Sequence, residues 1–409
     1  MNPLDPQSWK KVIRFMKPKI PKNLPRDVWI LGFVSLLTDI SSEMIHSVLP
    51  LFLVLTLGAN SITVGAIEGI AEATASVVKI FSGALSDYWG QRKGLAIAGY
   101  GLSTLVKPLF AIASSPTWVL FARFADRVGK GIRVAPRDAL VADVTTPDQR
   151  GAAYGLRQSL DTIGAFLGPL IAFALLSIST QNFRLVFLVA LFPGFLAVAL
   201  LAIGIQEPKA PIQASRHPLQ WSAIKRFSRQ YWGLVGIALL FNLGNSSDAF
   251  LLLKAQQTGI ESAQIPLTLV VMNIAYSLSA YPIGFLSDRV SRMGLLAGGL
   301  SLYALVYLGF GFAQSPGQIW ILFAFYGLCL GMSQGVLLAI VADNTPSDLR
   351  GTAFGLINLV TGVALLPASL LAGFLWKTVS PQATFLVGSG FAISALALLL
   401  QMQLRSRQT

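Results

Sequence analysis

Residues 83–87 read Gly-Ala-Leu-Ser-Asp and end a long apolar stretch, and residues 284–288 read Gly-Phe-Leu-Ser-Asp and end another about 200 residues later. A second landmark repeats at nearly the same spacing, because Thr146-Pro147 and Thr345-Pro346 are each followed by an Arg-Gly pair. Two landmarks that recur at one offset indicate an internal duplication. The sequence therefore predicts two similar halves, joined by the polar, basic linker 206–231.

The apolar stretches between these landmarks have the length of membrane crossings. Of the 409 residues, 54% are hydrophobic and 12% are charged, and a helical crossing needs about 20 apolar residues. We expect twelve crossings: 28–57, 62–86, 95–113, 117–142, 152–178, 184–205, 232–257, 264–287, 294–313, 318–342, 352–377 and 383–403. The predicted fold is an all-α integral membrane protein of twelve transmembrane helices, in two pseudo-symmetric six-helix bundles at 28–205 and 232–404.

The basic residues are distributed as a membrane topology requires. The net charge is +13, and 20 of the 31 Lys and Arg residues fall in segments on the side of the N-terminus, including the basic segment 1–27, whereas three lie near the opposite loops. Such an excess marks the cytoplasmic side. We expect both termini in the cytoplasm, a location in the inner (cytoplasmic) membrane, and contact with anionic lipid rather than nucleic acid.

Few residues could hold a cofactor. The single cysteine, Cys329, excludes an intrachain disulfide and a cysteine-built metal centre, and only two histidines, His46 and His217, are present. No nucleotide-binding P-loop motif occurs. The sequence predicts no cofactor, no metal site and no enzyme activity, so that any transport would be driven by a gradient.

Several motifs resemble those of one transporter family. Residues 83–93, Gly-Ala-Leu-Ser-Asp-Tyr-Trp-Gly-Gln-Arg-Lys, resemble the loop 2–3 signature of the major facilitator superfamily, with Gln91 where an arginine is usual. Residues 127–131 resemble its fourth-helix arginine motif, and residues 164–169 the fifth-helix signature of its proton-driven exporters. Thr38-Asp-Ile-Ser-Ser-Glu-Met44 and Gly-Lys-Gly-Ile-Arg-Val-Ala-Pro-Arg-Asp-Ala at 129–139 resemble a prokaryotic subgroup.

The resemblance implies a secondary transporter that functions as a monomer, with a small molecule and protons as partners. At its cytoplasmic face we expect a latch in which carboxylates at helix ends pair with cations. The gate residues would be Gly83, Asp87, Gly90, Arg92 and Asp288. A plain turn with basic flanks is the alternative.

Ionisable side chains inside the crossings of the first half are the candidate transport residues, since such groups are costly in a membrane. For proton coupling we expect Asp39, Glu43, Arg127, Arg157 and Asp161. For the substrate cavity we expect His46, Glu68, Glu72, Lys130 and Arg133. A structural salt-bridge network is the alternative, because crossings one to five hold eight acids and eight bases, which permits full pairing.

The second half carries mainly amides and aromatics in its crossings. Its candidate cavity residues are Asn242, Asn245, Asp248, Asn273, Tyr276, Tyr326, Gln334 and Asn358. These residues suggest a division of labour, with proton coupling in the first half and shape-selective contacts in the second. Simple interhelical bonding is the alternative.

The function predicted from these features is proton-coupled transport of a small organic solute by alternating access, with export favoured by the fifth-helix signature. An importer or uniporter of a small organic anion, such as a carboxylate, phosphate ester or siderophore, is the alternative. Divalent metal export through the carboxylates of the first half is a further alternative, although neighbouring bases would compete with the metal.

Overall fold

A computed structural model describes residues 24–89, 91–146, 149–179, 181–206, 226–287, 290–345 and 349–408. Within these ranges every long element is a helix. Much of the predicted N-terminal segment and linker, together with Gly90 and Asp288, lies outside the described residues, and so do the side chains of Asp87 and Gln334.

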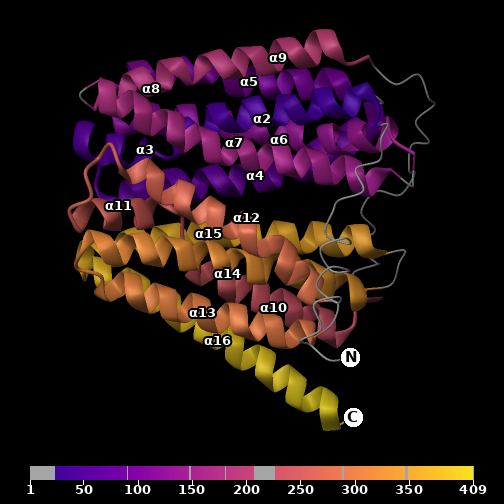
Figure 1. The fold of residues 1–409 in the computed structure, drawn as a ribbon. Coiled ribbons are helices and arrows are strands. Elements are labelled where there is room, and N and C mark those ends of the chain that lie inside the picture. The colour runs from indigo at the N-terminus through magenta and orange to yellow at the C-terminus, as the bar shows by residue number, and fades with distance from the viewer. Residues whose placement is uncertain are drawn as a thin grey trace, which may run out of the picture.

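The first half comprises α2 (Arg26–His46), α3 (Leu49–Leu51), the π-helical turn η1 (Phe52–Thr56), α4 (Ser61–Trp89), α5 (Arg92–Ile112), α6 (Pro116–Asp143), α7 (Arg150–Ile178), α8 (Phe183–Val189) and α9 (Leu191–Gly204). The second half comprises α10 (Arg229–Gly244), α11 (Ala249–Gln257), α12 (Ile265–Ser287), α13 (Arg292–Phe312), α14 (Pro316–Asp343), α15 (Arg350–Thr378) and α16 (Pro381–Gln408). The two groups form separate layers in Figure 1.

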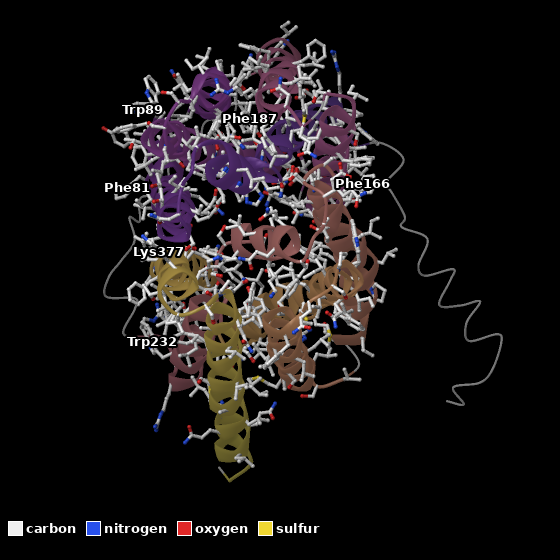
Figure 2. The ribbon with its side chains drawn as sticks, turned by 90° about the vertical axis from the view of Figure 1, so that its left-hand side faces the viewer. Phe81, Trp89, Phe166, Phe187, Trp232 and Lys377 are labelled. Carbon is white, nitrogen blue, oxygen red and sulfur yellow. The ribbon has the colours of Figure 1, made fainter. Side chains whose placement is uncertain are left out.

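Among the described residues, ten helical spans are long and apolar enough to cross a membrane. The other two long helices, α4 and α6, carry ionisable side chains along their length and complete the expected set of twelve crossings. Phe81 and Trp89 of α4 are 69% and 57% exposed and point away from the first half in Figure 2. An apolar surface of this kind is suited to lipid.

Three of the predicted crossings are interrupted rather than continuous. The first ends as α2 at His46 and continues through α3 and η1, and the sixth is divided between α8 and α9 at Ala190. The seventh is unwound between Gly244 and Ala249. At the break in the sixth crossing, the carbonyl of Ala190 accepts a hydrogen bond from Ser41. The unwound segment of the seventh crossing carries polar side chains that form hydrogen bonds with tyrosines.

The duplication read from the sequence is present in the helix boundaries. α5, α6 and α7 span 92–112, 116–143 and 150–178, and α13, α14 and α15 span 292–312, 316–343 and 350–378. Each helix of one set therefore begins and ends 200 residues from its counterpart.

Helices α4 and α15, and helices α7 and α12, form the main contacts between the halves. The Ser61 hydroxyl donates to the Gly373 carbonyl at 3.0 Å, and the Asn273 amide donates to the Ala165 carbonyl at 3.0 Å. In the end-on view of Figure 2, α11 lies between the two halves, and it packs against α3 and α4. The contact between α4 and α15 runs from the start of α4 to about its middle, where Ser76 lies against Gly362.

Candidate transport site

Helix α6 carries the largest set of charges in the protein. Pro116 occupies its first turn, and the hydroxyl of the preceding residue, Ser115, accepts from a backbone N–H, so that the helix begins at a fixed position. Arg123, Asp126 and Arg127 are at most 5% exposed. Their burial shows that these three charges of α6 face protein, since such groups are not stable against acyl chains.

Glu68 and Arg123 form the most deeply buried ion pair among the described residues. Arg123 donates to Glu68 at 2.8 Å, and both side chains are 1% exposed. His46 Nε2 lies 4.0 Å from Glu68, and His46 Nδ1 lies 3.5 Å from Glu43. A chain of contacts therefore leads from α6 through α4 to α2.

Arg127 bridges two carboxylates. Its Nη1 lies 3.1 Å from Glu72 on α4, and its Nε lies 3.2 Å from Asp126 on its own helix. The Glu72 side chain is 31% exposed, whereas that of Arg127 is 6% exposed. Glu72 is therefore the accessible end of this bridge.

A second ionic cluster joins α6 to α7. Arg157 contacts Asp161 at 2.6 Å and Asp138 at 3.8 Å, and Arg137 contacts Asp138 at 2.9 Å. Arg137 also donates to Ser35 of α2 at 3.1 Å. These pairs tie three helices together, which is the structural network that the sequence left open as an alternative for Arg157 and Asp161.

Five charged groups in the first five crossings have no oppositely charged partner within 4 Å among the described residues: Asp39, Lys79, Lys107, Lys130 and Arg133. Arg133 donates to Ser103 at 2.6 Å and lies over the Tyr100 ring at 4.9 Å. Lys107 donates to the hydroxyl of Ser41. Asp39 and Lys130 are half-buried, and for the described residues neither shows a hydrogen bond or an ion pair.

Sequence reasoning did not select Lys107 as a site residue, although a lone lysine in an apolar crossing was a visible signal. It also missed Ser41, Tyr100 and Ser103. Nothing in their own sequence neighbourhood marks these three residues, since their roles depend on which helix faces them.

Tyrosines organise the polar groups of the second half. Asn245 Oδ1 accepts from the hydroxyls of Tyr303, Tyr307 and Tyr326 at 3.1, 3.4 and 3.0 Å. Tyr326 also lies 3.0 Å from Asp248. The amide of Asn245 and the carboxylate of Asp248, which were both predicted, are thus brought together by one tyrosine.

The other predicted residues of the second half lie in different settings. Asn273 bonds across the halves, Tyr276 is half-buried on α12, and Asn242 donates to the carbonyl one turn earlier on its own helix. Asn242 and Asn358 line a pocket of about 260 Å³ between α10, α13, α14 and α15, and Asn245 lines it as well.

The described residues contain no group of three or more His, Cys, Asp or Glu side chains placed to hold a metal ion.

Comparison with known proteins places this geometry in a family. The model of the Major Facilitator Superfamily matches residues 31–254 and 249–408. The chain belongs to the Major Facilitator Superfamily. It is a transporter and not an enzyme, and the family and fold predicted from the sequence are confirmed.

Three relatives of this facilitator illustrate the range of its similarity. An uncharacterised MFS-type transporter of Methanocaldococcus jannaschii is 34% identical over 93% of this chain and 95% of its own. A cis,cis-muconate transport protein of Acinetobacter baylyi is 24% identical, covering 90% of each chain. A gentisate transporter of Corynebacterium glutamicum is 25% identical, covering 85% of this chain and 80% of its own.

Solved structures share the fold of this facilitator. A bacterial homologue of the human lysosomal transporter Spinster superposes with a TM-score of 0.76 at 15% identity, covering 93% of this chain and 96% of the other. A POT family transporter in complex with 5-aminolevulinic acid gives a TM-score of 0.77 at 13% identity, covering 94% and 96%.

Packing accounts for the fifth-helix signature of this facilitator. A Cβ atom at Gly164 would lie 2.8 Å from Asp39 Cβ, and one at Gly168 would lie 2.7 Å from Glu43 Cβ. Both glycines therefore let α7 approach α2 at the level of the two predicted coupling acids. Since close packing gives these glycines a role, they do not by themselves indicate export.

The gate prediction can be placed only in part. Gly83 lies on α4, and Arg92 contacts Asp143 at 2.6 Å. This described ion pair joins α5 to α6 within the first half of the facilitator. Asp87, Gly90 and Asp288 are the gate residues whose side chains or positions lie outside the described part.

Proposed function

We propose that this facilitator moves a small organic anion across the cytoplasmic membrane by alternating access, coupled to protons. The observation that carries the proposal is the position of Lys130. It is half-buried on the charged helix α6, and no carboxylate of the described residues lies within 4 Å of its amino group.

The charges around Lys130 favour an anion. Arg123, Arg127 and Arg137 of the same helix each have a carboxylate partner, whereas Lys130 and Arg133 do not. Arg127 and Arg133 act electrostatically on Lys130, and so do the carboxylates of Glu72 and Glu43, although neither carboxylate lies within 4 Å of its amino group. A substrate carboxylate would supply the missing counter-ion through charge-assisted hydrogen bonds.

The named relatives support the same class of substrate. Muconate and gentisate are both small organic carboxylates, and transporters of these compounds align with most of this chain. The organic anion, which was the alternative reading of the sequence, therefore becomes the leading one.

Asp39 is the residue that we propose for proton coupling. It lies among charges of both signs, since Glu43, Asp161, Arg133 and Arg137 act on it electrostatically. With no hydrogen-bond partner among the described residues, its carboxylate can exchange a proton without breaking an ion pair. Arrival of a substrate anion nearby would favour the protonated form, which couples the two movements.

The contacts between the halves support alternating access. Those of α4 with α15 run along the first half of α4 and the second half of α15, which the topology predicted from basic residues assigns to the outer side. We propose that 28–205 and 232–404 move as two units about the linker 206–231, in a monomer with both termini in the cytoplasm.

The proposal is tested by transport into proteoliposomes of the full chain, with radiolabelled benzoate as the probe and an imposed pH gradient. We expect accumulation that requires the gradient and is lost in Lys130→Gln, which removes the counter-charge. Lys377→Gln is the matched control. It removes the same charge from an exposed residue at the C-terminal end of α15, in the second half (Figure 2).

Uptake with the outside acidic indicates symport, and expulsion under that gradient indicates antiport. Equal accumulation by the wild type and Lys130→Gln would refute the assignment of Lys130.

A further inference from the structure

The pocket between α10, α13, α14 and α15 occupies the place that the second ionic cluster fills in the first half. None of the residues lining it is charged, and five of them are Ser333, Leu337, Leu338, Ile357 and Thr361. The residues 200 positions earlier are all charged: Arg133, Arg137, Asp138, Arg157 and Asp161. Because α13, α14 and α15 repeat the boundaries of α5, α6 and α7, these positions correspond in the fold.

The two halves have used equivalent space differently. In the first half, ion pairs of 2.6 to 3.8 Å fill the site with protein atoms. In the second half, shorter apolar and hydroxyl side chains leave about 260 Å³ open. A cavity of roughly 150 Å³ lined by apolar side chains is large enough to bind benzene. The space therefore suits a single substituted ring.

The polar groups of the pocket are neutral. Asn358 shows no side-chain hydrogen bond to any described residue, and Asn245 uses its oxygen for the tyrosines, which leaves its NH₂ group as a donor. Neutral amides among Ile237, Phe241 and Leu300 can bond a hydroxyl on a ring but offer no counter-ion to a carboxylate.

The pocket is connected to the charges of the first half. Asn245 and Asp248 share the hydroxyl of Tyr326, and His46 and Glu43 act electrostatically on Asp248. A ligand that reaches from the pocket past Asp248 would thus approach charged groups of α2 and α4, and Glu72 of α4 in turn contacts Arg127 of α6.

We propose that this pocket is a binding subsite for the apolar, single-ring body of the substrate, whose carboxylate is bound by the first half at Lys130. The inference rests on the proposed function for the carboxylate and goes beyond it for the ring. It makes the substrate class a monocyclic, hydroxylated or unsubstituted carboxylic acid.

Equilibrium binding to the purified full chain tests the subsite, with benzoate, acetate and benzyl alcohol as probes. We expect benzoate to bind roughly 10- to 100-fold more tightly than acetate, from burial of the ring. Leu337→Trp should abolish this ratio by filling the pocket, whereas Leu337→Ala should preserve it. An unchanged ratio in a folded Leu337→Trp protein would overturn the proposal.

A second variant keeps the test decisive if Leu337→Trp does not fold. Asn358→Leu retains the volume and removes the amide, so it should reduce the preference for 3-hydroxybenzoate over benzoate, and an unaltered preference would count against the subsite. Benzyl alcohol separates the two proposals. If it binds as tightly as benzoate and its binding is still weakened by Leu337→Trp, the ring subsite is supported and the proposed binding of a carboxylate at Lys130 is refuted.

Discussion

Arg92 donates to a carboxylate oxygen of Asp143 at 2.6 Å, and this ion pair joins the first residue of α5 to the last residue of α6. The relationship recurs 200 residues later, where Arg292 and Asp343 join α13 to α14 at 2.5 Å. An arginine at a helix N-terminus and an aspartate at a C-terminus each oppose the helix dipole. Their pairing offsets both unfavourable placements, which gives the duplicated turn a physical reason.

The duplicated pair allows a comparison within one molecule. The side chain of Asp143 is 28% exposed and that of Asp343 is 58% exposed. We expect Asp143→Asn to lower the unfolding free energy by about 1 kcal/mol and Asp343→Asn by less, because water screens the more exposed pair. Thermal unfolding in detergent measures both, and a larger loss at Asp343 would contradict this reasoning.

We expect Glu68 to stabilise the fold rather than to bind substrate. Removing one partner of a buried ion pair leaves an uncompensated charge and costs ~3–5 kcal/mol. We therefore expect Glu68→Gln to lower the unfolding temperature strongly, and Glu72→Gln, whose side chain is 31% exposed, to lower it much less. Replacing both Glu68 and Arg123 with leucine should recover most of the loss. Equal effects of the two single variants would argue against the difference in burial.

Asp39→Asn should separate coupling from substrate binding. An asparagine keeps the shape of the side chain but cannot carry a proton, so gradient-driven accumulation should fall by about tenfold or more while substrate exchange continues. Accumulation and counterflow in proteoliposomes measure the two activities, with Asp343→Asn as the control. If the variant fails to fold, Asp39 belongs to the structural network instead.

Gly65→Val should prevent closure of the two halves. A Cβ atom at Gly65 would overlap the carbonyl oxygen of Ser369 on α15, whereas one at Gly155 on α7 would meet open space. The reporter is Ser61→Cys, at the contact of α4 with Gly373 of α15, in a chain that also carries Cys329→Ser. We expect this thiol to react faster with a polar maleimide in the Gly65→Val background, because the separated helices would expose it. Gly155→Val should leave the rate unchanged. The same rate in both backgrounds would show that α4 and α15 tolerate the added bulk.

Arg127→Lys should lose more activity than conservation of charge suggests. The guanidinium contacts Glu72 through Nη1 and Asp126 through Nε, and a single ammonium group cannot reproduce both directions. We expect the initial rate of benzoate transport to fall by roughly tenfold or more at an unchanged level of folded protein, since the two carboxylates would no longer be held by one cation. Transport at the wild-type rate would show that charge alone is sufficient.

The sequence by itself determined the number and order of the crossings and the duplication. Hydropathy is a local property, and a run of about 20 apolar residues has one stable arrangement in a bilayer. The repeated motifs that begin at Gly83 and Gly284 can be read directly from the sequence. The same is true of the difference between an ionic first half and an amide-rich second half.

The tertiary structure alone decided which of those charges are neutralised. Glu68 and Arg123 are 55 residues apart, and no local pattern distinguishes their buried pair from the unpaired Lys130 seven residues further along α6. The breaks at Ala190 and before Ala249 were also hidden, because the groups that satisfy the interrupted backbone come from other helices. Ion pairing depends on which helices meet, and contacts between distant parts of the chain settle that.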